Sequence, residues 1–296
     1  MNRPIQIILT GMGISAVLAF IKLIAGWLGH SFALTADGLE SISDVFGSFI
    51  MMLGLRYTSK PPDKEHPFGH GRVEPLLAMV IIILLLTTAG SIIYFSIDNI
   101  LTPHEAPRLF TLLISAMVII VKEIIFRWIR RSNAQLNSSV LAAESMHHRS
   151  DAISSLAAFT GISLALLLGK GYESMDDWFA LVAAVIILYN CYVIFRPAFS
   201  ELMDEQNQIE LLERIKTVAR TVDGISDIEK CYIRKNGMNF LVDIHIEVDG
   251  NMSVYESHIL AHKVEEILLQ SDMNIIYVAT HVEPDDNIIR KPYYLK

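Results

Sequence analysis

Two pairs of side chains that commonly bind metal ions lie four residues apart inside otherwise apolar stretches. Glu40 and Asp44 lie in the segment LTADGLESISDVFGSF, and His147 and Asp151 lie in LAAESMHHRSDAISS. Burying an ionised carboxylate is costly unless it is paired or bound to a cation. Because residues i and i+4 lie on one face of a helix, two such faces opposed would surround one ion with three carboxylates and an imidazole.

This mixed set of oxygen and nitrogen donors suits Zn²⁺ or another divalent transition metal better than Ca²⁺ or Mg²⁺, which prefer oxygen ligands alone. Asp37 and Glu144 each precede a pair by three residues, and they either support the ligands or contribute to packing. The alternative is that the acids pair with Lys22 or Lys122, which also lie in apolar stretches. In that case the charged groups would only specify how the helices pack.

The composition is that of an integral membrane protein with a polar domain. Of the 296 residues, 52% are hydrophobic and 19% are charged, and the mean hydropathy is +0.41. The second and fifth apolar spans are the least hydrophobic and carry the ligand pairs, so their polar faces must point into the bundle. The six predicted membrane helices cover residues 6–28, 32–57, 76–97, 109–128, 138–169 and 177–198.

The basic residues predict the orientation of this six-helix bundle. They cluster where the second helix connects to the third and the fourth to the fifth, as Arg56, Lys60, Lys64, Arg72, Arg127, Arg130 and Arg131. By the positive-inside rule, both termini are cytoplasmic. The first apolar run is too long for the core of a signal peptide, so we expect it to remain as the first helix. The protein is thus predicted to be a multi-pass protein of the cell (inner) membrane, embedded in the lipid bilayer.

Residues 205–296 form a predicted cytoplasmic domain, separate from the transmembrane domain of residues 1–204. Their pattern predicts the order helix, strand, strand, helix, strand, with an Asn-Gly hairpin turn at Asn236. This order suits a small open sheet covered by helices on one side. The domain holds 16 acidic and 10 basic residues, which argues against a nucleic-acid partner. Cys191 and Cys231 lack CxxC spacing, so we expect neither a disulfide framework nor a thiolate zinc site.

A second candidate metal site lies on the predicted cytoplasmic side, after the second span. Asp63, His66 and His70 have spacings of three and four residues, so one loop or short helix could present all three to one cation. Three protein ligands would leave a coordination position open for exchange. The alternative is a solvated loop whose histidines cap the next helix.

A third candidate lies in the predicted cytoplasmic domain. His281 and Glu283 are two residues apart on the last strand and therefore share a face, which His245 could join from a neighbouring strand. His258 and His262 lie on the predicted helix. Taken alone, each histidine fits an ordinary surface position better than a ligand position.

Taken together, these motifs resemble the cation diffusion facilitator family, in particular the bacterial zinc and iron efflux transporters. The resemblance rests on ADGLESISD, DKEHPFGHGRVEP and HHRSD, and it covers nearly the whole chain. It implies a six-helix α-helical membrane domain and a C-terminal α+β domain with a ferredoxin-like, metallochaperone-like fold. It also implies a homodimer that exchanges divalent metal ions for protons.

The resemblance assigns roles to the candidate residues. It places the transport site on Glu40, Asp44, His147 and Asp151, and a loop site on Asp63, His66 and His70. It implies cytoplasmic-domain metal ligands at His245, His258, His281 and Glu283, and an interlock near the dimer axis between Arg72 and Asp204. Two positions depart from the family pattern. Glu40 replaces the usual His, Asp or Asn, and Glu229 stands where zinc transporters often have His.

The predicted function is therefore proton-coupled export of a divalent transition metal by alternating access. Zn²⁺ is the expected substrate, with Fe²⁺ and Mn²⁺ next, and no organic cofactor is expected. The chain is not expected to be an enzyme. The main alternative, an intramembrane metal-dependent hydrolase, needs an open coordination position and a general base, and no HExxH motif is present. A passive channel is disfavoured because a four-ligand site binds transition metals too tightly for fast conduction.

Overall fold

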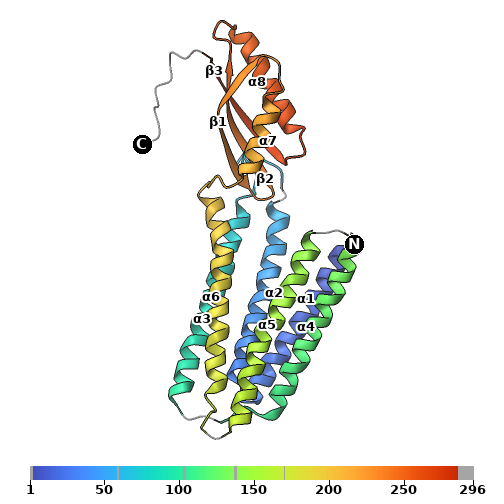
Figure 1. Cartoon of the computed structure of the whole chain (residues 1–296), viewed down its shortest axis with the longest axis vertical. Helices are drawn as coiled ribbons and strands as arrows, with labels where there is room; N and C mark the ends of the chain where they lie inside the picture. Colours follow the sequence, from blue (N-terminus) through green and yellow to red (C-terminus); the bar gives the residue numbers. More distant parts are fainter. Residues whose placement is uncertain (1–2, 59, 103–104, 137–138, 170, 286–296) are drawn as a thin grey trace. The chain divides into compact units, whose positions relative to one another are not determined.

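The computed structural model describes residues 3–58, 60–102, 105–136, 139–169 and 171–285 of the protein. The chain forms two compact units, and their elements are shown in Figure 1. The first unit consists of Met1–Met52 and Ala78–Phe195 and is helical. The second unit combines Leu53–Leu77 with Arg196–Lys296, so it joins a segment from the first half of the chain to the C-terminal domain.

Six long helices follow one another along the first two thirds of the chain. Within the described residues, five of them are long and apolar enough to cross a membrane. The exception by composition is α2, which carries Asp37, Glu40 and Asp44 within eight residues. The sequence predicted six spans; five of the described helices meet the criterion, and the sixth long helix, α2, is the one that carries the predicted ligands Glu40 and Asp44. The helices are α1 (Arg3–Leu28), α2 (Phe32–Thr58), α3 (Val73–Leu101), α4 (Leu109–Leu136), α5 (Ser139–Leu168) and α6 (Met175–Leu202).

Small side chains hold α2 close to its neighbours. Ala33 and Ala36 of α2 pack in one buried cluster with Ala158 of α5 and with Ala184 of α6. Small residues let helix backbones approach closely. In a bilayer there is no hydrophobic driving force between helices, so this close packing is what holds them together. On the other side, α4 contacts α5 and α1 (Figure 1). Asp37, Glu40, Ser41 and Ser43 of α2 are buried, whereas Ser48 of α2 and His147 and Ser150 of α5 are exposed, so protein encloses only part of the two polar faces.

A buried carboxylate anchors the start of α2. Asp176, at the start of α6, accepts hydrogen bonds from the backbone N–H of Ala33 at 3.0 Å and from Ser31 Oγ at 2.9 Å. The Ala33 N–H is one of the backbone groups that a helix N-terminus leaves unsatisfied. The negative charge of Asp176 also complements the helix dipole there. This contact fixes one end of the helix that carries Glu40 and Asp44.

The C-terminal domain has the α+β order predicted from the sequence. It contains α7 (Ile209–Ala219), β1 (Ile225–Asn236), β2 (Asn239–Val248), α8 (Val254–Leu269) and β3 (Ile275–Pro284). The sheet order is β1-β2-β3, with β1 antiparallel and β3 parallel to β2, so α8 is the crossover between the parallel strands. The predicted hairpin is confirmed: Asn236 pairs with Asn239, and Gly237 adopts φ of 63° in the turn.

Alternation along the strands gives the sheet one apolar face and one polar face. Ile244 and Ile246 of β2 are buried in a core with Ile215 of α7 and with Val264 and Leu268 of α8. The residues between them therefore point to the opposite face, because successive strand side chains alternate. This places His245 on the face that the helices leave open. Cys191 and Cys231 are both buried and free.

Candidate metal sites

The helical unit contains a cavity of about 200 Å³ that is lined by all four predicted transport-site residues. Glu40 and Asp44 reach it from α2, and His147 and Asp151 reach it from α5. Leu85, Ile187 and Ile194 supply apolar walls, and Ser150 and Asn190 supply further polar groups. The two helical faces thus oppose each other as their i,i+4 spacing predicted.

Three of these residues already have their ligand atoms close together. One donor atom each from Asp44, His147 and Asp151 lies within 4.8 Å of the others. His147 Nδ1 is 3.8 Å from Asp151 Oδ1. Donor atoms in a tetrahedral zinc site are about 3.3 Å apart, given bonds of about 2.0 Å. Small side-chain rotations would therefore close this group around a single ion.

Glu40 lines the cavity but lies outside this three-residue group. Its side chain is buried, and Oε1 accepts a long hydrogen bond of 3.4 Å from Ser154 Oγ. Oε2 has no hydrogen-bond partner among the described residues. A buried carboxylate oxygen without a partner is costly, and a bound cation would remove that cost. The direct ligand role predicted for Glu40 stays a prediction.

The two intramembrane lysines both pair with acids. Lys22 Nζ is 2.9 Å from Asp37 Oδ2 and also donates to Ser155 Oγ at 2.9 Å. Lys122 Nζ is 2.5 Å from Asp151 Oδ2. Asp37, which lies outside the predicted ligand pairs, has Lys22 as its partner, so it contributes to packing. Asp151 contacts Lys122 and also lines the cavity of the candidate metal site, so its carboxylate is shared between the two. The side chain of Glu144 lies outside the described part of the structure.

Asn190 of α6 is a cavity residue that the sequence did not single out. It is an amide within the apolar run VIILYNCYVIF of a membrane helix. A polar residue in such a run points toward the bundle interior or a cavity, so this isolated Asn was a usable signal. Its carbonyl oxygen adds one more potential donor to the site.

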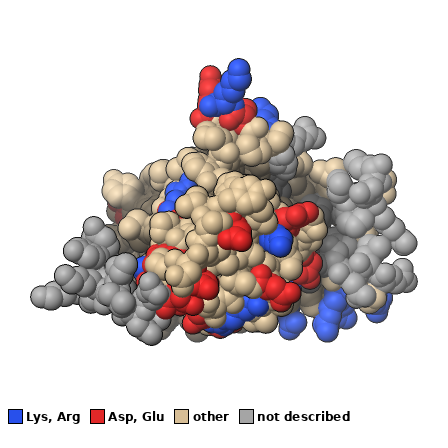
Figure 2. All heavy atoms as spheres, turned by 90° about the horizontal axis from the view of Figure 1, so that it is seen from above, with Lys and Arg blue, Asp and Glu red and all other residues tan. Residues whose placement is uncertain are grey.

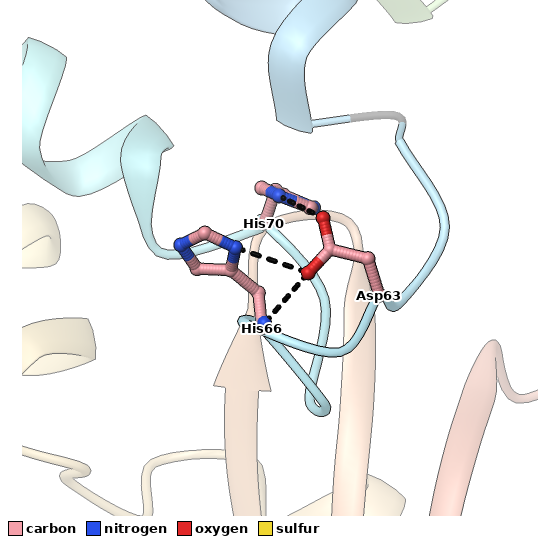
Figure 3. A group of neighbouring side chains, drawn as sticks. All are labelled: Asp63, His66 and His70. Carbon is pink, nitrogen blue, oxygen red and sulfur yellow. Dashed lines mark hydrogen bonds and ion pairs between the residues drawn. The ribbon is translucent and has the colours of Figure 1, made fainter.

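The loop between α2 and α3 brings Asp63, His66 and His70 together, as Figure 3 shows. Asp63 Oδ1 is 3.2 Å from His66 Nδ1, and Asp63 Oδ2 is 3.3 Å from His70 Nε2. The hydrogen bond that the His66 backbone N–H donates to Asp63 lowers the pKa of this carboxyl below its usual range. The carboxylate thus lies between two imidazoles, a geometry that suits one cation.

The same loop is attached to the hairpin of the C-terminal domain, within the second unit. Asn236 Nδ2 donates to the carbonyl oxygen of Phe68 at 2.7 Å, and the Phe68 ring meets Tyr277 edge to face with centroids 5.3 Å apart. Arg72 Nη2 pairs with Asp204 Oδ1, so the two residues of the predicted interlock are in contact within one chain. The loop site is therefore held by both the α+β domain and the end of α6.

The open face of the sheet carries a third group, formed by His245, His281 and Glu283. His245 on β2 pairs in register with His281 on β3, and His245 Nδ1 is 2.8 Å from Glu283 Oε1. The hydrogen bond from His245 is the main reason why the pKa of Glu283 lies below its ordinary value. Glu229 approaches from β1, 3.8 Å from His245 Nδ1. The position noted as a departure from the family pattern thus borders this group.

His258 is placed elsewhere. It is exposed on α8, and its ring lies next to that of His262, with centroids 4.4 Å apart. Within one chain the structure does not bring it to the His245 group, so its role as a ligand stays a prediction.

In the view from above in Figure 2, acidic and basic side chains are interspersed over the face shown, and acidic ones gather at several places.

Family models match both parts of the chain. The model described as the cation efflux transmembrane domain matches residues 8–203. The model described as the cytoplasmic domain of cation efflux proteins matches residues 209–285. The two matches together span almost all of the residues described by the structure.

Individual relatives are similar over nearly their full lengths. The manganese efflux system protein MneP of Bacillus subtilis is 27% identical over 267 residues, covering 89% of this chain and 90% of that protein. The uncharacterized transporter MJ0449 of Methanocaldococcus jannaschii is 31% identical over 287 residues, covering 95% and 98%. A solved structure of the MamM CTD is 22% identical, with a TM-score of 0.26, and covers 26% of this chain and 96% of its own.

Proposed function

Because the chain belongs to the cation diffusion facilitator family of metal efflux proteins, we propose that it is a proton-coupled antiporter that exports a divalent transition metal from the cytoplasm by alternating access. The observation that carries this proposal is the cavity where Asp44, His147 and Asp151 converge beside Glu40. The metal ion is the substrate here. Family membership gives no support to the alternative of an intramembrane hydrolase.

We propose that exchange for protons is a property of the ligands themselves. His147 cannot coordinate through a nitrogen that carries a proton, so protonation and metal binding exclude each other at this residue. Carboxylates that crowd together also bind protons more readily once the metal has left. Metal release on the outside and proton release on the inside then follow from the same four side chains.

Three metals are candidates for the substrate. An imidazole ligand favours Zn²⁺, as expected from the sequence, and Fe²⁺ fits the same donors. Three carboxylates among four ligands favour Mn²⁺, and MneP is named as a manganese efflux protein. We propose that Zn²⁺ and Mn²⁺ compete for the site, with oxygen donors from Glu40 and Asn190 deciding the preference.

The proposed exchange is tested by metal uptake into proteoliposomes that contain the wild-type protein. Zn²⁺, Mn²⁺ and Fe²⁺ are supplied in turn at two opposite pH gradients, and internal pH is recorded in parallel. We expect metal uptake to rise when the vesicle interior is more acidic than the outside, because proton exit then drives metal entry. The internal pH should rise in parallel with metal uptake. Uptake that is indifferent to the pH gradient would contradict antiport.

We further propose that the C-terminal domain, residues 205–296, joins two copies of the chain and senses metal. We take the dimer to have a tighter and a looser arrangement. A cation bound to His245, His281 and Glu283 would favour the tighter arrangement only if that arrangement binds the cation with higher affinity. The transmembrane domain would then comprise residues 1–204. We place the protein in the cell (inner) membrane, with both termini in the cytoplasm.

Chelation is expected to loosen this dimer. Distances between spin labels on the two cytoplasmic domains of the full-length protein should be short and narrow with metal, and longer and broader after chelation. In His245→Ala the distances should stay long at all metal concentrations. His262→Ala is the matched control, because His262 lies on α8, and it should respond as the wild type does. Identical distances with and without metal in the wild type would refute metal sensing.

A further inference from the structure

Lys122 of α4 is in direct contact with the candidate transport site. Its side chain is 1% exposed, so its ammonium group is shielded from solvent by protein. Nζ lies 2.5 Å from Asp151 Oδ2 and donates a hydrogen bond of 3.0 Å to Ser15 Oγ of α1. A small cavity of about 20 Å³ is lined by Lys122 together with Asp44, His147 and Asp151. The ammonium therefore borders the same three side chains that converge on the candidate ion position.

The contact differs from that of the other buried lysine. Lys22 pairs with Asp37, which lines neither cavity. The carboxylate that Lys122 contacts, among the described residues, is Asp151. Lys22 thus neutralises a carboxylate outside the ligand group, whereas Lys122 neutralises a carboxylate within it. A buried ammonium also requires a counter-charge, since an isolated charge in an apolar bundle is strongly unfavourable.

A divalent ion and this ammonium would compete for the negative charge of Asp151. Asp151 Oδ2 points to Lys122, whereas Oδ1 faces His147 Nδ1 at 3.8 Å. A metal ion between His147 and Asp151 would lie within a few ångströms of the ammonium, where the two positive charges repel strongly at the low effective dielectric of a protein interior. Lys122 has a flexible four-carbon stem and a second partner in Ser15, so it can withdraw without leaving its ammonium entirely unpaired.

We propose that Lys122 is a tethered internal cation that competes with the substrate metal for Asp151. This inference rests on the proposed function of the cavity as the transport site. Without metal, Lys122 holds Asp151 and offsets part of the negative charge of the ligand group. Metal entry takes Asp151 away from the ammonium, and the return of the ammonium to Asp151 assists metal release. The lysine thereby keeps binding weak enough for turnover, and it acts through its charge as a positioning residue.

The test compares Lys122→Gln with Lys122→Arg in the full-length protein, with Zn²⁺ and Mn²⁺ binding measured by titration calorimetry. We expect Lys122→Gln to bind metal at least ten-fold more tightly than the wild type, because the competing charge is gone. In proteoliposomes the same variant should show a lower KM together with a lower kcat, since release slows. Lys122→Arg keeps the charge and should bind metal no more tightly than the wild type.

The outcomes separate this inference from the proposed function. Unchanged or weaker binding by folded Lys122→Gln would overturn the competition, and so would tighter binding by Lys122→Arg, which remains informative if the Gln variant does not fold. A purely structural lysine predicts lower thermal stability and weaker metal binding. Asp151→Asn serves as the reference for the site: if it binds metal normally, the transport site itself is misplaced. If it loses binding while Lys122→Gln is unchanged, only the role of Lys122 fails.

Discussion

Asp44→Ala and Asp151→Ala should each abolish metal-dependent proton flux in proteoliposomes. Each substitution removes one member of the group whose donor atoms lie within 4.8 Å of one another. Loss of a supporting hydrogen-bond partner around a metal commonly costs about 10- to 100-fold in affinity, and loss of a ligand should cost at least as much. We therefore expect a loss of transport of about 100-fold or more at metal concentrations near the wild-type KM.

Asp98→Ala is the matched control for these variants. Asp98 is an exposed aspartate near the end of α3 that lines neither cavity of the ligand group. Its removal changes the net charge by the same amount but should leave flux close to that of the wild type. Wild-type rates in Asp44→Ala or Asp151→Ala, measured in the same vesicles with the same protein density, would place the transport site elsewhere.

Lys22→Met should strongly destabilise the helical unit. Lys22 is 0% exposed, and its ammonium forms an ion pair of 2.9 Å with buried Asp37 and donates to Ser41 Oγ and Ser155 Oγ. Removing one partner of a buried pair leaves an uncompensated charge, which typically costs about 3 to 5 kcal/mol. The measurement is the midpoint of thermal unfolding of the purified protein in detergent, followed by loss of the monodisperse chromatographic peak.

Two further variants show whether the uncompensated charge is the cause. The double variant Lys22→Met with Asp37→Leu removes both charges and should recover most of the lost stability, because replacing both partners by apolar groups is often neutral. Arg127→Ala breaks an exposed i,i+4 pair with Glu123 and should change stability by less than about 1 kcal/mol. If Lys22→Met shifts the midpoint no more than Arg127→Ala does, the pair contributes little.

The sequence predicted the elements of this protein well because their patterns are local. Long apolar runs fix membrane helices, and alternation with an Asn-Gly turn fixes the β1–β2 hairpin. The i,i+4 spacing of Glu40 with Asp44 and of His147 with Asp151 fixes which side chains share a helical face. The cost of exposing those faces to lipid then required α2 and α5 to face protein. The structure has the cavity between these faces, lined by all four residues.

Contacts between helices could not be predicted in the same way. Lys22 and Lys122 were both visible within apolar runs, but which acid each would pair with depends on how α1 and α4 rotate against α2 and α5. The structure gives Asp37 to Lys22 and Asp151 to Lys122. Asn190 was similarly visible as a polar residue in α6, but its place on the cavity is a property of packing.

The loop site shows the same division between local and long-range information. The spacing of Asp63, His66 and His70 was enough to propose a common ligand group, because a short loop keeps such residues close. The hydrogen bond from Asn236 to Phe68 joins residues 168 positions apart, and no local pattern encodes it. The position of His258 on α8, away from His245, is likewise decided by the packing of the helix on the sheet.

Locating the bound substrate ion is the most direct measurement of the central claim. Crystals or oriented samples of the full-length protein, loaded with Mn²⁺ or Zn²⁺, would be measured with X-rays at the absorption edge of the metal, and the anomalous signal would be mapped. If the helical cavity is the transport site, the map has a peak in the helical unit, within coordination distance of Asp44, His147 and Asp151 and with an oxygen of Glu40 beside it. Occupied loop and sheet sites with an empty helical cavity, in a protein that transports the same metal, would contradict this claim.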